Sequence, residues 1–322
     1  MKKISFIIPV FNEAESLETL CSRIIEQIKI LTDKNVINDY EIWFIDDGSN
    51  DTSVSVVKEL IETDSKVKLI SFRRNFGKAT ALQAGFRHSS GDYIITMDAD
   101  LQDDPSDVPR MLQKLEEGYD LISGWKKDRK DSFEKRIPSK LFNAVTSTLS
   151  GLKLHDFNCG FKAYKREVVT NIDLYGELHR YIPVLAHRRG FRVTEIPVTH
   201  HKRKHGKSKY GFERYLRGFF DSLTATFLSR FYNKPMYFFG LLGLFFFLAG
   251  FAICTVLTIQ WFMGIGIGGR PLLNLGVLLI ILGVQSISTG FIGDMVVDAT
   301  FRNRYNEAHV KEIIDVKENK TT

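Results

Sequence analysis

Two carboxylates follow an apolar run that is expected to form a buried strand. Residues 93–97 read YIITM, and Asp98-Ala99-Asp100 comes next. Because strand side chains alternate, Asp98 and Asp100 can point to the same side, with the small Ala99 between them. Two hard oxygen ligands in this arrangement suit Mg²⁺ or Mn²⁺ carrying the diphosphate of a substrate. A solvated turn at a strand end would give the same pattern. The residues at the neighbouring strand ends are needed to distinguish a metal site from such a turn.

The elements that must position this pair alternate along the chain. Apolar runs typical of strands occur at 4–10, 41–45, 67–72, 93–97 and 121–123, and helical patterns occur between them at 14–31, 52–62, 78–86 and 107–117. Such alternation predicts a mostly parallel sheet with helices on both faces. Asn12 with Glu15 resembles a capping box for the first helix, and Asp104-Pro105 places proline at a first helical position.

Polar residues collect where these strands end. The first strand is followed by FNE at 11–13, the second by DDGS at 46–49 and the third by RRN at 73–75. In open α/β sheets, ligands bind outside the carboxyl ends of the strands, so four polar strand ends predict one site. Asp46 and Asp47 can accept hydrogen bonds from a ribose or a base. Capping of the next helix is the alternative, although Asp51 can supply that cap without them.

Neither a P-loop motif nor a GxGxxG pattern follows the first strand, so neither kind of glycine-rich phosphate site is supported. Four other segments together resemble a known family: 7–13 (IIPVFNE), 46–51 (DDGSND), 75–78 (NFGK) and 98–103 (DADLQD). They resemble the family 2 glycosyltransferases of the GT-A fold, in particular the polyprenyl-phosphate sugar transferases related to dolichol-phosphate mannose synthase and bactoprenol glucosyltransferases. A Rossmann-like GT-A catalytic domain is therefore expected over residues 1–210.

The resemblance assigns residues to a nucleotide-sugar donor. It implies that Asp98, Asp100 and Gln102 gather around Mg²⁺ or Mn²⁺ and the donor diphosphate. The residues implied for donor binding as a whole are Pro9, Asn12, Glu13, Asp46, Asp47, Lys78, Asp98 and Gln102.

A second cluster, 156–162 (DFNCGFK), contains a candidate catalytic carboxylate. Asp156 resembles the family's acidic residue that faces the acceptor, while a capping or turn role would explain the same spacing. In an ordinary transfer to an alcohol, a carboxylate base removes the acceptor proton. A phosphate monoester has a second pKa of about 6 and is already largely ionised near neutrality. We therefore expect Asp156 to position the acceptor as much as to abstract a proton, and Asp100 to share the catalytic role by stabilising charge.

A basic run occupies residues 200–210 (HHKRKHGKSKY). A solvated loop, a nucleic-acid patch and an anionic-lipid site are the three interpretations. The chain offers no base-reading module, which disfavours nucleic acid despite a net charge of +6. The GKSKY segment is similar to the family's GxSKY element, which is associated with acceptor phosphate binding. The residues expected to hold the acceptor phosphate are Arg203, Lys207, Ser208 and Lys209, with Arg136 as a further candidate.

The last third of the chain is more apolar than the rest. Residues 235–261 and 272–297 are apolar over lengths that can cross a bilayer, for which about 20 residues suffice. Cationic residues before the first stretch and after the second predict a two-helix hairpin with both termini in the cytoplasm. Aromatic residues at spacings of three and four predict an amphipathic helix within 211–233, which either packs on a core or lies at the membrane interface, and 301–322 is expected to be a cytoplasmic tail. Glycines in both stretches permit close packing, within the hairpin or between copies in a homo-oligomer.

These observations predict transfer of one hexose, from UDP-glucose, to a polyprenyl phosphate such as undecaprenyl phosphate. The reaction is expected at the cytoplasmic face of a bacterial inner membrane, dependent on a metal and inverting at the anomeric carbon. Three scattered cysteines fit a reducing compartment. GDP-mannose or a modified UDP-pentose is the alternative donor. A non-catalytic lipid-binding membrane scaffold is the alternative from another class, although a degenerate site would be expected to lose Asp98 or Asp100.

Overall fold

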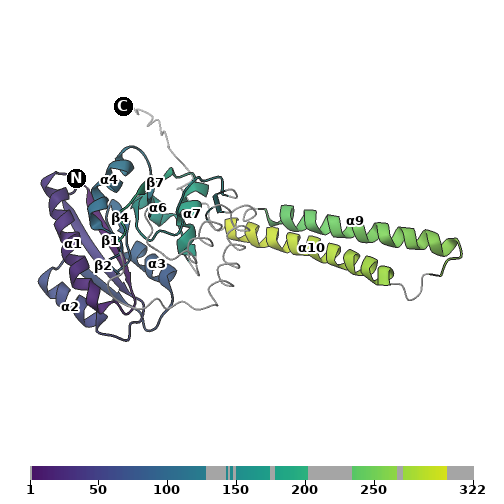
Figure 1. The fold of residues 1–322 in the computed structure, drawn as a ribbon, viewed down its shortest axis with the longest axis horizontal. Coiled ribbons are helices and arrows are strands. Elements are labelled where there is room, and N and C mark those ends of the chain that lie inside the picture. Colours follow the sequence, from purple (N-terminus) through teal and green to yellow (C-terminus); the bar gives the residue numbers. More distant parts are fainter. Residues whose placement is uncertain are drawn as a thin grey trace, which may run out of the picture. The chain divides into compact units, whose positions relative to one another are not determined.

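The computed structural model describes residues 2–127, 143, 146, 147, 150–174, 178–201, 234–266 and 271–302. The chain divides into two compact units, Met1–Ala225 and Thr226–Thr322 (Figure 1). The expected amphipathic helix at 211–233 lies outside the described residues, as does the expected tail beyond 302.

The first unit is built on one seven-stranded sheet in the order β3-β2-β1-β4-β6-β5-β7. Its strands are β1 (Lys3–Val10), β2 (Asp39–Asp46), β3 (Val67–Ser71), β4 (Tyr93–Thr96), β5 (Leu121–Trp125), β6 (Lys162–Lys165) and β7 (Val193–Pro197). All neighbours pair in parallel except β6, which is antiparallel to β4 and to β5. The predicted mostly parallel sheet is confirmed. The strands β6 and β7 were not expected, because KAYK and VTEIP contain no continuous apolar run.

Helices cover both faces of the sheet, as predicted. They are α1 (Ala14–Asp33), α2 (Ser53–Thr63), α3 (Lys78–His88), α4 (Val108–Glu116), α6 (Arg166–Thr170) and α7 (Ile182–Arg188), with 3-10 turns η1 (Pro105–Asp107) and η2 (Leu178–Tyr181). Figure 1 shows α1 and α2 along one face and α3 along the other. The helix α3 approaches β1 so closely that a Cβ at Gly85 would lie 2.3 Å from Ile7 Cγ2.

Of the two predicted helix starts, one is wrong. Asn12 has a left-handed φ of 57°, and its Oδ1 accepts a hydrogen bond from Asn50 N at 2.8 Å. Glu13 is the cap residue of α1, without a side-chain capping bond, so there is no capping box. The proline start is confirmed, because Pro105 opens η1 and Asp104 Oδ1 accepts from Ser106 N at 2.9 Å.

The chain order reverses beside β1. From β1 the chain runs outward through β2 to β3, and it then returns to place β4 on the other side of β1. Such a switch leaves a crevice outside the carboxyl ends of the two strands that flank it. The residues after Val10 and Thr96 therefore border the crevice.

The second unit contains two long apolar helices, α9 (Pro235–Phe262) and α10 (Pro271–Arg302). Both are long and apolar enough to cross a membrane, with mean hydropathies of 2.4 and 2.1. A Cβ at Gly243 would lie 2.7 Å from the carbonyl oxygen of Gly283, and one at Gly250 would lie 2.6 Å from that of Gly276. These glycines therefore pack within the hairpin, while the homo-oligomer stays a prediction.

At the amino-terminal end of the parallel strands, a buried acid ties several elements together. Glu41 on β2 is fully buried, and its Oε1 accepts from Ser5 Oγ at 2.7 Å and Ser90 N at 2.6 Å. Its Oε2 accepts from Lys68 Nζ at 2.9 Å and lies 3.3 Å from Lys3 Nζ. Burial alone would raise the pKa of Glu41, but these hydrogen bonds and charges outweigh burial and lower the pKa from 4.5 to about 2. The ionised carboxylate thus holds three strands and the residues before β4.

We predict that Glu41→Gln makes the melting temperature less dependent on pH between about pH 5 and about pH 2. Because the folded pKa lies below the unfolded one, the carboxylate stabilises the fold fully above about pH 5 and loses this effect as the pH falls towards about 2. Its contribution at neutral pH is roughly 2–4 kcal/mol. Melting temperatures of the full chain in detergent, measured across this range, test the prediction. A wild-type curve that falls no more steeply than the Glu41→Gln curve would contradict it.

Candidate active site

The aspartate pair lies in a turn directly after β4. The strand ends at Thr96, two residues before Asp98, and Leu101 turns the chain with a left-handed φ of 59°. Gln102 N donates to Asp100 Oδ1 at 3.2 Å. Ala99 and Leu101 are buried, while both aspartates stay partly exposed. The turn, and not the strand alternation assumed in the sequence analysis, therefore orients the two carboxylates.

Asp98 is enclosed by cations and by backbone. Lys78, the first residue of α3, forms an ion pair with Asp98 Oδ1. A Cβ at Gly160 would lie 2.7 Å from both carboxylate oxygens, so a larger residue at this position would displace the Asp98 carboxylate. Burial opposes the ionisation of Asp98, but the charges of Lys78 and Lys126 outweigh burial and lower the pKa to about 2. Asp98 is therefore a full anion at neutral pH.

Asp100 carries charge that its surroundings compensate only in part. Burial raises its pKa, and the neighbouring charge of Asp98 raises it further, to about 6. A divalent cation relieves such a concentration of negative charge. Carboxylate and amide oxygens are ligands that Mg²⁺ and Mn²⁺ prefer, so Asp98 and Asp100, with Gln102, fit such an ion. No group of three or more His, Cys, Asp or Glu side chains in the described part of the chain could hold a metal, so substrate oxygens or water would complete the coordination.

A buried ion pair supports the turn. The side chain of Asp103 is inaccessible to solvent, and Lys126 Nζ lies 2.9 Å from its Oδ1. Asp103 Oδ2 accepts a long hydrogen bond, 3.4 Å, from the backbone nitrogen of Asp98. Burial would lower the pKa of Lys126, but Asp103 and Asp98 outweigh burial and raise it. Sequence reasoning misses Lys126, although its place directly after β5 makes it one more polar strand end.

The loops after β1 and β2 are joined by predicted donor residues. Asn12 N donates to Ser49 Oγ at 2.9 Å, and Glu13 N donates to Ser53 Oγ at 3.1 Å. Pro9 lies opposite Ile45 in the β1–β2 pair. The structure thus brings Pro9, Asn12 and Glu13 to the edge of the crevice, and their contact with a nucleoside stays a prediction.

Asp46 and Asp47 hold the loops around them. Asp46 accepts from Ser49 N at 3.1 Å and from Ser71 Oγ at 2.9 Å. The two oxygens of Asp47 accept from the backbone nitrogens of residues 76 and 77 at 2.7 and 2.9 Å, and burial raises its pKa. The cap residue of α2 is Thr52, without a side-chain capping bond, and Asp51 accepts from Ser53 N, so neither Asp46 nor Asp47 caps this helix. Their predicted role in donor binding remains compatible with these positions.

Asp156 is buried in a turn of its own. Its Oδ1 accepts from Asn158 N at 3.1 Å, and its carbonyl oxygen accepts from Ser123 Oγ on β5 at 3.4 Å. The turn role left open by the sequence is therefore present, and the acceptor-facing role stays a prediction. The predicted acceptor phosphate residues, Arg136, Arg203, Lys207, Ser208 and Lys209, lie outside the described residues.

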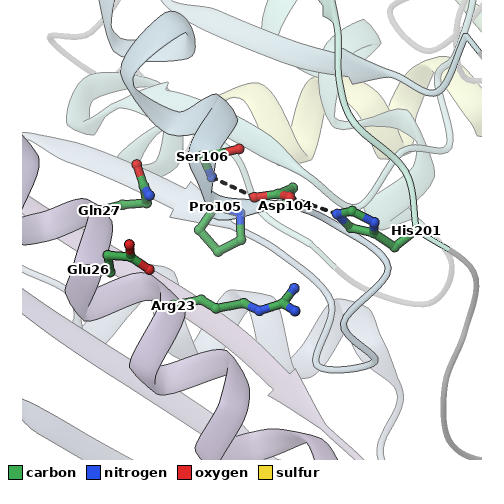
Figure 2. A pocket seen from close by; sticks show the side chains of 7 residues that line it. All are labelled: Arg23, Glu26, Gln27, Asp104, Pro105, Ser106 and His201. Atoms are coloured by element: carbon green, nitrogen blue, oxygen red, sulfur yellow. Dashed lines mark hydrogen bonds and ion pairs between the residues drawn. The ribbon is translucent and has the colours of Figure 1, made fainter.

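A separate polar cavity of about 270 Å³ lies beside α1. Figure 2 shows its lining: Arg23, Glu26 and Gln27 from α1, Asp104, Pro105 and Ser106 at η1, and His201. His201 Nε2 lies 2.7 Å from Asp104 Oδ2, and His201 N donates to Gln102 O at 2.8 Å. The cavity contains neither Asp98 nor Asp100, so it is not the predicted donor site. Its histidine fastens the chain after β7 to the aspartate turn.

Comparison with known proteins identifies the family. The model of the glycosyl transferase family 2 matches residues 5–172, which include the crevice and the aspartate turn. The dodecaprenyl-phosphate galacturonate synthase of Rhizobium johnstonii is 36% identical over 322 residues, covering 97% of this chain and 93% of the relative. This chain belongs to glycosyltransferase family 2.

Solved structures of other proteins share its fold. Glucosyl-3-phosphoglycerate synthase from Mycobacterium tuberculosis, in complex with Mn²⁺, UDP-glucose and phosphoglyceric acid, matches with a TM-score of 0.53 and 17% identity, over 71% of this chain and 79% of that one. Its complex with Mn²⁺, UDP and phosphoglyceric acid gives a TM-score of 0.52 and 20% identity, over 71% and 78%. The first unit of this glycosyltransferase therefore has the predicted GT-A fold.

We predict that Lys126→Met destabilises this glycosyltransferase by roughly 3–5 kcal/mol, because Asp103 would stay buried without its partner. The exposed neighbour provides a matched control, since Lys127→Met should change the free energy of unfolding by less than about 0.5 kcal/mol. Chemical unfolding of the full chain in detergent, followed by tryptophan fluorescence, compares the two variants. Equal stability of Lys126→Met and Lys127→Met would rule out this role for the pair.

Proposed function

We propose that this glycosyltransferase transfers a sugar from a nucleoside diphosphate sugar to a polyprenyl phosphate at a membrane surface. The observation that carries the proposal is the turn of Asp98 and Asp100, where the ionised Asp98 lies beside Asp100, whose negative charge is compensated only in part. Identity of 36% to a dodecaprenyl-phosphate galacturonate synthase supports the lipid acceptor, as do two helices apolar enough to span a membrane. A bacterial inner membrane, with the catalytic unit and both termini in the cytoplasm, remains part of the proposal.

For the donor we propose a UDP-linked hexuronic acid. The name of the Rhizobium johnstonii relative gives galacturonate as its sugar, which favours UDP-galacturonate over UDP-glucose, the donor expected from the sequence. The Mycobacterium tuberculosis complexes with UDP and Mn²⁺ share only the fold, and they make UDP and Mn²⁺ the first reagents to test. UDP-glucose, GDP-mannose and a UDP-pentose are the competing donors.

The chemistry needs little proton transfer. The acceptor phosphate arrives ionised, so one of its oxygens attacks the anomeric carbon from the face opposite the nucleoside diphosphate. The bond from that carbon to the diphosphate breaks, the configuration inverts, and negative charge grows on the leaving group. Asp98 and Asp100 would hold Mg²⁺ or Mn²⁺, which supplies compensating charge to the diphosphate when bound. Lys78, which is already at this turn, adds a fixed positive charge.

The acceptor side of the proposal rests on the sequence. Arg203, Lys207, Ser208 and Lys209, with Arg136, would bind the lipid phosphate, and the aromatic face of 211–233 would guide the lipid chain. Asp156 would position the acceptor. The non-catalytic scaffold is the competing function; a degenerate enzyme would be expected to lose Asp98 or Asp100, and both are present.

A donor panel tests the proposed function. The purified full-length protein in detergent is mixed with Mn²⁺, undecaprenyl phosphate and labelled UDP-galacturonate, UDP-glucose, GDP-mannose or a UDP-pentose. We expect labelled lipid with UDP-galacturonate and none after chelation of the metal. If no common nucleotide sugar gives labelled lipid, the transferase proposal fails and the scaffold is favoured.

The two carboxylate sites should differ in their effect on turnover. Asp98→Ala or Asp100→Ala should lower kcat by more than about 100-fold, because charge on the leaving group would lose its stabilisation. Asp156→Asn should cost less, since the acceptor is already ionised. Initial rates and a pH–rate profile of Asp156→Asn measure the difference. Complete loss of turnover in Asp156→Asn, with both substrates still bound, would instead identify an obligatory base.

A further inference from the structure

An exposed histidine next to the candidate catalytic carboxylate contacts two side chains from neighbouring strands. His155 directly precedes Asp156, and its ring stacks on Trp125, the last residue of β5, with 4.2 Å between ring centroids and 15° between planes. The stack fixes the plane of the imidazole. The proposed function assigns nothing to His155 or to Trp125.

Glu195 on β7 contacts both the backbone and the ring of this histidine. Its Oε1 is bound to His155 Nδ1, and its Oε2 accepts from His155 N at 2.8 Å. The same Oε2 accepts a longer hydrogen bond, 3.4 Å, from Asp156 N. Only 12% of the Glu195 side chain is exposed. One nearly buried carboxylate therefore orients both the imidazole and the backbone of Asp156.

This arrangement leaves the second ring nitrogen available. The His155 side chain is 67% exposed, and within the described ranges Nε2 forms no hydrogen bond. Because Nδ1 is bound to a carboxylate, a proton on Nε2 makes the ring a cation that donates outward. Lys127 Nζ lies 5.7 Å from the centroid of the Trp125 ring, which adds positive charge to the surroundings.

The chain connects this imidazole to the aspartate turn. Residues 156–160 lead from His155 to Gly160, where an added Cβ would lie 2.7 Å from the carboxylate oxygens of Asp98. Five residues span at most roughly 17 Å, so the Cα atom of His155 lies no farther than that from the Cα atom of Gly160.

We propose that His155, positioned by Glu195 and Trp125, binds an anionic oxygen of a substrate through Nε2. Two substrate groups have this chemistry: the C6 carboxylate of a hexuronic acid donor and the phosphate of the lipid acceptor. The inference rests on the proposed function and adds a residue that recognises a negatively charged group of a substrate. His155 is the binding residue, whereas Glu195 and Trp125 are positioning residues.

Matched donors and matched variants distinguish the C6 carboxylate of the donor from the phosphate of the lipid acceptor. UDP-galacturonate and UDP-galactose differ only at C6, and UDP-galactose serves as a competitive inhibitor if it is not transferred. Two variants of the full chain are compared. His155→Phe keeps an aromatic ring next to Trp125, and Glu195→Gln removes the negative charge that contacts the imidazole. His187→Phe, at an exposed histidine of α7, is the control. Donor KM, acceptor KM, kcat and melting temperature are measured for each variant.

We expect His155→Phe to raise one KM by about 10-fold, the loss typical of a hydrogen bond to a charged group. Glu195→Gln should raise the same constant by less, and His187→Phe should change nothing. An increase for UDP-galacturonate but not for UDP-galactose identifies the sugar carboxylate, and an increase in acceptor KM alone identifies the lipid phosphate.

Three results would overturn the inference and leave His155 a structural residue. They are unchanged KM values, the same increase in KM for both donors, or a lowered melting temperature with no change in KM. Wild-type protein that transfers no sugar at all would instead defeat the proposed function, so the two failures are distinguishable.

Discussion

The crowding of negative charge after β4 is the constraint on which the rest of the first unit depends. Asp98, Asp100 and Asp103 lie within six residues, and Asp103 is fully buried. Isolated buried carboxylates are too costly to keep ionised. The fold therefore brings Lys78 from α3 and Lys126 from the end of β5 to the same place. These cations balance Asp98 and Asp103 but leave Asp100 with a raised pKa. That remaining imbalance makes the turn a candidate for a divalent cation and a diphosphate.

Much of this could be predicted because it depends on local patterns. Alternating apolar runs and helical periodicity give the first five strands and α1 to α4, and polar residues after parallel strands must meet at one edge. The hairpin of α9 and α10 follows from length and hydrophobicity alone. The capping box fails for a local reason that the sequence does not reveal, because Asn12 adopts a left-handed conformation and bonds to the loop after β2.

The parts that could not be predicted depend on contacts between distant segments. Gly160 is 62 residues from Asp98 in sequence, yet its missing side chain makes room for that carboxylate. The partners Lys126 and Asp103, and likewise His155 and Glu195, meet in a sheet where β6 lies antiparallel between β4 and β5, and β7 pairs with β5. Short strands such as β6 carry too little pattern to place in a sheet, so the residues that they bring together stay hidden in the sequence.

The central claim is that a divalent cation at Asp98 and Asp100 meets the donor diphosphate. A crystal or cryo-EM structure of the full-length protein with Mn²⁺ and UDP-galacturonate tests it most directly, with anomalous scattering at the manganese edge to locate the metal where crystals permit. The account predicts Mn²⁺ roughly 2 Å from oxygens of Asp98 or Asp100 and from diphosphate oxygens. Nucleotide sugar bound in the crevice with no metal at this turn, or with the metal bound elsewhere, would contradict it.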